Sequence, residues 1–254
     1  MFKKFRIFIL SAIFLYLCYQ TYVDLNPNWD GEQVIVLHPV NMSNSAEIDK
    51  YISNLKQSDF DDISKYLSNY AEEYRKNKTS IKFELGRKID SLPPAPTEEI
   101  AESMWRTILW SLKFKIYGYK NMKLEDLGAS AVLYLTYYDM RDKNETTRST
   151  ALQRGRIGMV TSYANEGYEG QNNMVIAHES LHLYGALDRY DPSTGVPNFP
   201  EGYADPKLEP LFPQVRAEIM GGYIPISNFD IIIPDSLNKV VIHEITAKEL
   251  GWID

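Results

Sequence analysis

The stretch His178-Glu179-Ser180-Leu181-His182-Leu183-Tyr184-Gly185-Ala186-Leu187-Asp188 is the most informative part of this chain. An apolar segment leads into it, which favours a helix at this point. Residues four apart lie on one face of a helix, so His178 and His182 can present imidazole nitrogens to a single metal ion. Glu179 follows the first histidine, where its carboxylate can reach a metal-activated water without binding the metal. The spacing predicts a zinc (Zn2+) site with Glu179 as the general base of a hydrolytic reaction.

A glycine and an aspartate complete the pattern. Gly185 can adopt a positive φ at low cost, so we expect the helix to end there and the chain to reverse. The reversal brings Asp188 back towards the two histidines, and an aspartate oxygen is an acceptable ligand for zinc. The sequence therefore predicts His178, His182 and Asp188 as the metal ligands.

Two other acidic residues compete for the place of third ligand. Glu201 begins Glu-Gly-Tyr-Ala-Asp, which matches the ExxxD pattern that gluzincins carry on a helix. Pro200 and Pro206 bracket that segment, and its internal glycine also disfavours a helix. Asp191 is a weaker alternative, so we favour Asp188.

The pattern HExxHxxGxxD resembles the zinc motif of the metzincin metallopeptidases, in the variant with aspartate as third ligand that snapalysin-like enzymes carry. The resemblance implies a methionine turn beneath the metal, and Met220 in the segment 217–222 is the candidate. Several metzincins place an oxyanion-supporting tyrosine two positions after that methionine. Gly222 holds this position here and Tyr223 follows it, so Tyr223 is a candidate catalytic residue beside the alternative of a packing tyrosine.

The same resemblance implies the fold class, which is α+β or α/β in the manner of the zincins. We expect a mixed, mostly parallel sheet with an antiparallel edge strand, an active-site helix and a C-terminal helix. The segment from Val240 to Leu250 would supply that last helix. The segment from Arg156 to Tyr163 would be the edge strand that pairs with substrate. The similarity itself covers only residues 170–223 or so.

Outside the motif, hydrophobic periodicity predicts further elements. Val34 to Leu37, Ser80 to Leu85 and Ala129 to Tyr138 are apolar and rich in strand-forming residues, so they are expected strands. The segment from Ser45 to Lys76 predicts one or two amphipathic helices. From Arg189 to Pro213 the chain has no periodicity, and a long loop there would shape the substrate pocket.

A further helix is expected to begin at Thr97, because two glutamates follow it in the first turn. Apolar residues then recur at every fourth position. We expect this stripe to belong to the hydrophobic core; its members are Ile100, Met104, Ile108, Leu112 and Ile116.

Composition excludes some classes of function. The 254 residues carry a net charge of -7, so there is no broad basic field for a nucleic-acid backbone. Cys18 is the single cysteine, so no disulfide can form within the chain. The other two histidines, His38 and His243, are expected to be structural or exposed.

The first 24 residues differ from the rest of the chain. Three basic residues precede an apolar run from Ile7 to about Val23, which predicts an uncleaved signal anchor or, alternatively, a signal peptide. A lipid-modified Cys18 is a weaker alternative, since the bulky Leu17 precedes it. Basic residues before the run place residues 25–254, one catalytic domain, outside the cytoplasm or, after cleavage, in the secreted fraction.

The leading functional hypothesis is a membrane-tethered zinc metalloendopeptidase that acts on peptide or protein substrates. One alternative is a non-catalytic metal-binding or assembly module with the same fold, although such a module has no need of the base Glu179. Another is an amidase that acts on a non-protein amide. The sequence leaves the oligomeric state open.

Overall fold

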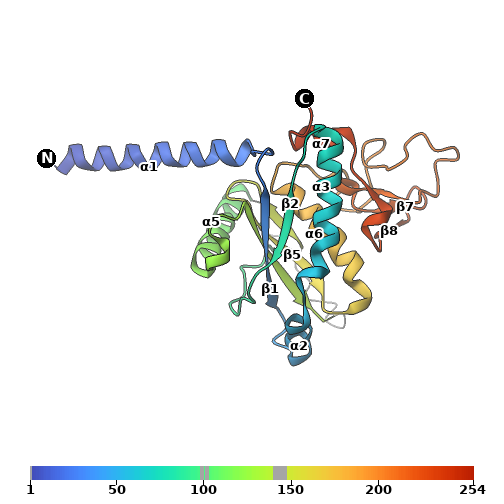
Figure 1. Ribbon diagram of the computed structural model, residues 1–254, viewed down its shortest axis with the longest axis horizontal. Helices are drawn as coiled ribbons and strands as arrows, with labels where there is room; N and C mark the ends of the chain where they lie inside the picture. The colour runs from blue at the N-terminus through green and yellow to red at the C-terminus, as the bar shows by residue number, and fades with distance from the viewer. Residues whose placement is uncertain (1, 98–99, 101–102, 140–147) are drawn as a thin grey trace.

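The computed structural model describes residues 2–97, 100, 103–139 and 148–254. Helix α1 (Phe2–Leu25) projects from the body of the protein and buries none of its residues (Figure 1). In the described part of the chain, α1 is the one helix long and apolar enough to cross a membrane. Its length and composition fit a signal anchor, a membrane span or a signal sequence.

A five-stranded sheet forms the centre of the body. Its strands are β1 (Gln33–Asn41), β2 (Ile81–Leu85), β3 (Ala131–Tyr138), β4 (Thr150–Leu152) and β5 (Ile157–Tyr163), in the order β2-β1-β3-β5-β4. All neighbours are parallel except β4, which runs antiparallel to β5. The central strands are covered on both faces, which is why they read as nearly continuous apolar runs. The mixed, mostly parallel sheet with an antiparallel edge strand is confirmed.

The edge strand itself is not the one expected. Strand β5 pairs with β3 along its whole length and with β4 through residues 157–159. Among the described residues, β4 therefore forms this edge of the sheet, and the assignment of Arg156 to Tyr163 as the edge is wrong. Gly158 fits this interior position, because a side chain there would collide with Leu133 and with the backbone of β4.

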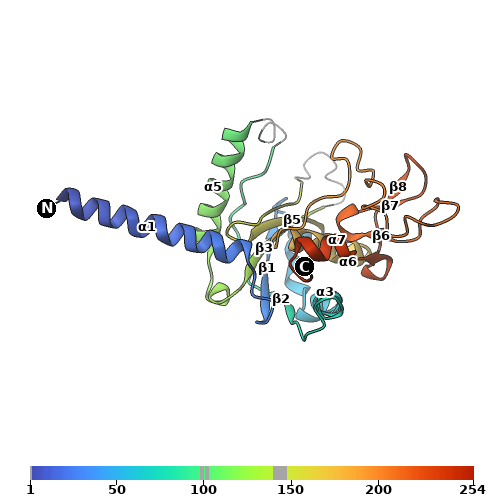
Figure 2. The same ribbon diagram turned by 90° about the horizontal axis from the view of Figure 1, so that it is seen from above.

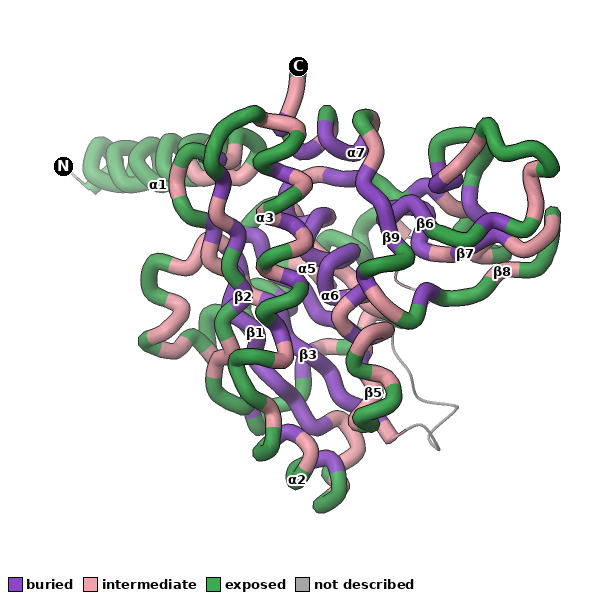
Figure 3. Tube along the Cα trace, turned by 45° about the vertical axis from the view of Figure 1, so that its right-hand side comes forward, coloured by how far each residue is buried: buried purple, intermediate pink, exposed green. Residues whose placement is uncertain are grey.

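Three helices cover one face of the sheet. They are α2 (Ala46–Asn54), α3 (Asp61–Arg75) and α6 (Glu169–His182), and they share a large core with alternate residues of β1 and β3. Ser45 caps α2 by accepting a hydrogen bond from the backbone N–H of Glu47 at 3.2 Å. Figure 3 shows buried residues along the central strands, while α2 and α3 carry both buried and exposed residues. The segment from Ser45 to Lys76, expected to form one or two amphipathic helices, forms two.

Helix α5 (Met104–Asn121) lies on the opposite side of the sheet from α3 (Figure 2). Its buried residues are Trp110, Phe114 and Tyr117, which pack with residues of β3 and β5 in a second, smaller core. The expected core stripe is wrong for its members on α5, because all are exposed: Met104, Ile108, Leu112 and Ile116. The helix has two apolar faces, and the three large aromatic side chains form the one that is buried. Most of the expected start of this helix lies outside the described residues.

After α6 the chain contains only short elements. Helix α7 (Glu244–Glu249) is preceded by β9 (Val240–Val241), which pairs in parallel with β6 (Ala217–Glu218). The expected helix from Val240 to Leu250 is therefore correct only from residue 244, because the β-branched residues before it join a strand pair. Strands β7 (Ile224–Pro225) and β8 (Ile231–Ile232) make a small antiparallel hairpin.

Short 3-10 helices lie in the connections along the whole chain. They are η1 (Gln57–Phe60), η2 (Leu124–Asp126), η3 (Glu166–Tyr168), η4 (Ile219–Gly221) and η5 (Leu237–Lys239).

Candidate metal centre

Helix α6 carries both histidines of the motif and is fixed firmly in the body. At its first turns, the side chain of Asn172 accepts a hydrogen bond from the backbone N–H of Tyr163 at 3.0 Å and donates one to the same residue's carbonyl at 2.9 Å. This bidentate contact ties the helix to the end of β5. Eight of the helix's residues are buried, including His178 and Glu179. The motif is thus presented from a rigid element.

Three ligand-type atoms converge at the end of α6. The Nε2 atoms of His178 and His182 are 3.1 Å apart, and Asp188 Oδ1 lies 3.2 Å from the first and 3.1 Å from the second. The ligand atoms of His178, Glu179 and His182 lie within 4.8 Å of one another, so this group could hold a metal ion. The sequence motif is therefore a spatial cluster, and Asp188 completes it.

The backbone sets the orientation of both imidazole rings. His178 Nδ1 lies 2.8 Å from the carbonyl oxygen of Ile219, and His182 Nδ1 lies 2.7 Å from that of Ala186. A carbonyl only accepts, so each Nδ1 carries the hydrogen and donates it. Both Nε2 atoms then direct lone pairs at the same point, next to a carboxylate oxygen. Such an arrangement requires a cation, either a proton or a metal ion, between the three atoms.

Gly185 creates the reversal that brings Asp188 into place. Its φ of 106° is a conformation that side-chain-bearing residues rarely adopt, and α6 ends just before it. A Cβ at this position would lie 2.6 Å from the side-chain nitrogen of Gln153. The turn is therefore built for glycine, as the motif predicts.

An ion-pair network supports the loop on both sides of Asp188. Glu249, at the end of α7, accepts a hydrogen bond from the backbone N–H of Leu187 at 3.0 Å and pairs with Arg189 at 2.8 Å. Arg189 also pairs with Glu201 at 3.2 Å. The rival ligand Glu201 is thus engaged by a guanidinium outside the three-atom cluster. The sequence gives no local signal for Glu249, because it lies 61 positions after Asp188.

The carboxylate of Glu179 is buried beside the histidines. One of its oxygens, Oε2, has no hydrogen-bond partner within the described residues. Burial raises the pKa of this carboxyl above its ordinary value, although the nearby imidazoles oppose the shift. A buried carboxylate with an open acceptor site is suited to take a proton from a small molecule bound next to it.

Met220 is fully buried in η4, directly after Ile219. The turn is held by Glu218, whose carboxylate accepts hydrogen bonds from the backbone of Met220 at 2.6 Å and Gly221 at 3.0 Å, and from the hydroxyl of Thr246 at 2.7 Å. The carbonyl of Ile219 in the same turn orients His178. The turn therefore reaches the cluster through backbone contacts, and Glu218 is a support that sequence reasoning missed.

Two tyrosines border the cluster. The ring centroid of Tyr190 is 6.3 Å from that of His178, and burial together with the negative charges of Asp188 and Glu179 raises the pKa of the Tyr190 hydroxyl. Tyr223 stands edge-on to Tyr190, with centroids 5.9 Å apart. The candidate Tyr223 is thus adjacent to the site, but Tyr190, which no sequence pattern singled out, lies nearer to the ligand atoms.

Charge around His182 changes its proton affinity. Burial lowers the pKa of this imidazole, but the hydrogen bond to Asp188 and the negative charges of Glu179 and Asp188 outweigh burial and raise it to about 9. Burial raises the pKa of Asp188, and the two histidines more than reverse this and hold it well below its usual range. Without a metal ion the cluster therefore carries a proton at neutral pH.

The remaining histidines lie elsewhere. His38 is fully buried and bridges the carbonyl of Arg87 at 2.7 Å and the carboxylate of Asp126 at 2.8 Å, which is a structural arrangement. His243 is the N-cap residue of α7 and is half-buried. Neither joins the metal cluster.

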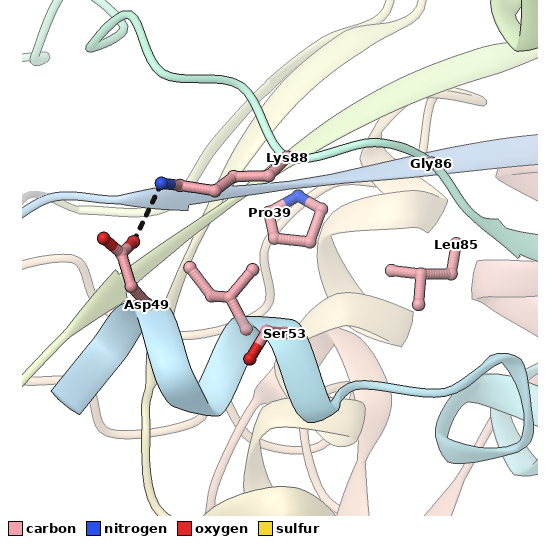
Figure 4. A pocket seen from close by; sticks show the side chains of 7 residues that line it. Pro39, Asp49, Ser53, Leu85, Gly86 and Lys88 are labelled. Atoms are coloured by element: carbon pink, nitrogen blue, oxygen red, sulfur yellow. Dashed lines mark ion pairs between the residues drawn. The ribbon is translucent and has the colours of Figure 1, made fainter. Parts of the chain in front are cut away.

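A hollow between α2 and the ends of β1 and β2 shares no residue with the cluster (Figure 4). Its two ionisable groups, Lys88 and Asp49, pair with each other at 2.8 Å. Lys88 also contacts Asp90 at 3.2 Å. The charges in this hollow are thus already neutralised, and the cluster on α6 is the stronger candidate for chemistry.

Comparisons with known proteins add little to this picture. No protein-family model and no curated protein matches the chain. A solved structure described as "Structure of a chaperone-substrate complex" is similar over 87% of this chain and 34% of that chain, with 14% identity and a TM-score of 0.37. The chain thus spans about a third of that protein, and a similarity of this size carries no argument about function.

Proposed function

We propose that the chain is a zinc-dependent metalloendopeptidase of the metzincin type, with His178, His182 and Asp188 as ligands. One observation carries the proposal. The Nε2 atoms of His178 and His182 and the Oδ1 atom of Asp188 lie 3.1 to 3.2 Å from one another, and backbone carbonyl groups fix the tautomers of both histidines. Ligands at about 2.0 to 2.1 Å from zinc in a tetrahedron stand about 3.3 to 3.4 Å apart, close to the observed spacing.

The donor set also favours zinc over the hard cations. Two imidazole nitrogens and one carboxylate oxygen suit zinc, whereas calcium and magnesium prefer oxygen ligands. Three protein ligands leave a fourth position for a reactant, which is typical of catalytic rather than structural zinc sites. When bound, zinc supplies Lewis-acid chemistry that polarises a carbonyl group and makes water more acidic.

Glu179 and the surrounding residues would perform the proton transfers. The open Oε2 atom of Glu179 takes a proton from the attacking water, and its raised pKa lets it hold that proton. The same carboxyl then donates the proton to the leaving amine. Tyr190 and Tyr223 are the candidates to stabilise the developing oxyanion.

The sheet offers a place for an extended substrate. Among the described residues, β4 has no strand on its outer side, so backbone groups of Thr150 to Leu152 can pair with a peptide. Residues of β4 and α6 also lie close together, and Gln153 beside Gly185 marks the junction. A substrate would therefore pair with β4, in place of the segment from Arg156 to Tyr163.

The N-terminal helix defines where the enzyme would act. At about 1.5 Å per residue, α1 is about 36 Å long, enough to cross a hydrocarbon core of about 30 Å. Lys3, Lys4 and Arg6 precede the apolar run and favour a cytoplasmic N-terminus. The catalytic domain would then face the extracytoplasmic side as an anchored enzyme.

The test is a peptide-library digestion with the zinc-loaded full chain and its Glu179→Gln variant. We expect cleavage by the parent and a loss of at least about 10²-fold in the variant, since a general base contributes that much or more. Equal zinc content in both proteins serves as the control. A zinc-loaded parent that cleaves no peptide, or a Glu179→Gln variant of equal activity, would contradict the proposal and favour the non-catalytic module.

A further inference from the structure

Helix α5 exposes a long apolar face that no described part of the protein covers. The exposed fractions of its large apolar side chains range from 45% to 77%. They are Met104, Trp105, Ile108, Leu109, Leu112, Ile116 and Tyr119. Contiguous apolar surface of this kind on a folded domain marks a site of interaction.

These side chains form one continuous face. At about 100° per residue, they fall within an arc of about 140° around the helix axis. The buried residues Trp110, Phe114 and Tyr117 occupy the other side and anchor the helix to the sheet. The exposed face is therefore not a misplaced core stripe, because the helix already has a complete buried face.

The charge of α5 differs in sign from that of the chain. The helix contains four basic and no acidic residues, whereas the whole protein has a net charge of -7. Lys115 lies within the apolar arc, near one edge, and Arg106, Lys113 and Lys120 lie beyond the other edge. Cations that flank an apolar arc, with a tryptophan and a tyrosine within it, are typical of helices in the interface of an anionic membrane.

The base of α1 lies beside α5. Asp24 accepts a hydrogen bond from the backbone N–H of Gly155 at 2.7 Å, and Arg156 donates to the carbonyl of Val23 at 2.8 Å. Gly155 is also next to α5, because a Cβ added there would lie 3.5 Å from the Cε atom of Lys115. The apolar helix α1 thus leaves the body where α5 is located.

The axis of α5 runs across the axis of α1 (Figure 2). Figures 1 and 2 show α5 on the side of the body from which α1 projects, and Figure 2 shows it running across the direction of α1. If α1 crosses a bilayer along its axis, α5 lies roughly parallel to the bilayer surface and close to it. This is the orientation of a helix that lies in the interface plane.

We propose that α5 is a second membrane contact, which inserts its exposed apolar face into the interface of an anionic phospholipid bilayer. The body is then seated on the membrane through α5, so that it does not swing freely on α1. The proposal concerns a surface separate from the metal centre and does not depend on the metallopeptidase activity.

The experiment uses the full chain in lipid nanodiscs with Cys18 replaced by serine. A single cysteine is placed at Leu109, within the exposed face, and labelled with an environment-sensitive fluorophore. The matched control carries the same label at Asn69, an exposed position of α3 on the opposite side of the sheet. Discs contain either phosphatidylcholine alone or a mixture with about one third phosphatidylglycerol, each with and without a lipid-bound quencher.

In anionic discs we expect the emission of the label at position 109 to be blue-shifted, and the lipid-bound quencher to reduce its intensity at least about twofold. The emission of the label at position 69 should not be quenched. Combined Lys113→Gln and Lys120→Gln replacement should reduce the quenching, since each basic residue near an anionic surface adds to binding. Circular dichroism of each variant establishes that it is folded.

Three results would overturn the proposal or a part of it. A label at position 109 that is no more quenched than the one at position 69 would show that the face does not reach lipid. A blue shift without lipid quenching would assign the face to a protein partner or to a second copy of the chain. Equal quenching in neutral and anionic discs would refute the role given to the basic residues.

Discussion

Glu249 and Arg189 form an ion pair with 2.8 Å between Oε1 and Nη2, and this pair joins helix α7 to the loop that carries Asp188. The other carboxylate oxygen of Glu249 accepts the backbone N–H of Leu187. Both chain neighbours of Asp188 are therefore held by one side chain that does not touch the cluster itself.

Glu249→Gln should weaken zinc binding while the protein stays folded. The substitution removes the charge that pairs with Arg189, and loss of an outer support of a metal ligand typically costs about 10- to 100-fold in affinity. Competition with a chromogenic chelator measures the affinity. Glu244→Gln, the same change at an exposed position of α7, is the control. Equal affinity of the two variants would show that Glu249 does not position Asp188.

Zinc binding should release a proton and strengthen with rising pH. The pKa of His182 is raised to about 9 in the metal-free protein, so the proton on this imidazole competes with the metal. Between pH 6.5 and 8 we expect the apparent affinity to rise about tenfold per pH unit. Calorimetry in buffers of different ionisation enthalpy measures the proton release.

The same shift has a consequence for stability. Folding raises the pKa of His182 from its ordinary value of 6.5 to about 9, so the protonated imidazole stabilises the metal-free folded protein. This stabilisation is fully present below pH 6.5 and is lost as the pH rises through about 9. A pH-independent zinc affinity, with no proton released, would contradict this account of the cluster.

Gly185→Ala should both destabilise the protein and weaken zinc binding. Alanine is strained at a φ of 106°, and its Cβ would crowd Gln153. Gly251→Ala is the matched control, since that glycine also has positive φ but nothing lies within 4 Å of an added Cβ. We expect a loss of about 1 kcal/mol in the free energy of unfolding for the control and about 2 kcal/mol for Gly185→Ala.

Urea unfolding followed by circular dichroism measures both values. Only Gly185→Ala should also reduce the zinc affinity, because only that turn positions Asp188. A Gly185→Ala variant that binds zinc like the parent would show that the reversal of the chain tolerates other conformations.

Tyr190→Phe should reduce turnover more than Tyr223→Phe. The ring of Tyr190 lies beside that of His178 in the cluster, whereas Tyr223 contacts the ring of Tyr190. A hydroxyl that stabilises the oxyanion contributes about 10²-fold to kcat, and its loss should leave zinc binding intact. Steady-state kinetics on a cleaved peptide compare the two variants. The reverse order of effects would assign the oxyanion role to Tyr223.

Local patterns predicted the elements that depend on local physics. The spacing of His178 and His182 on one helix face, the turn at Gly185 and the apolar strand at Ala131 to Tyr138 can all be read within a few residues. The approach of Asp188 to the histidines also follows from a reversal only a few residues long.

Long-range contacts explain what the sequence did not show. Glu249 and Glu218 support the cluster from far along the chain, and nothing near them in sequence marks that purpose. Helix α5 has two apolar faces, so periodicity identified a stripe without showing which face meets the sheet. The edge strand β4 is only three residues long, too short for a periodic signal.

Zinc content by elemental analysis tests the central claim most directly, with the purified full chain beside Asp188→Ala and Glu201→Ala. We predict about one zinc per chain in the parent and in Glu201→Ala, and a clear loss in Asp188→Ala, because Asp188 contacts both histidines whereas Glu201 pairs with Arg189. A folded parent without zinc, or zinc retained in Asp188→Ala and lost in Glu201→Ala, would contradict the account.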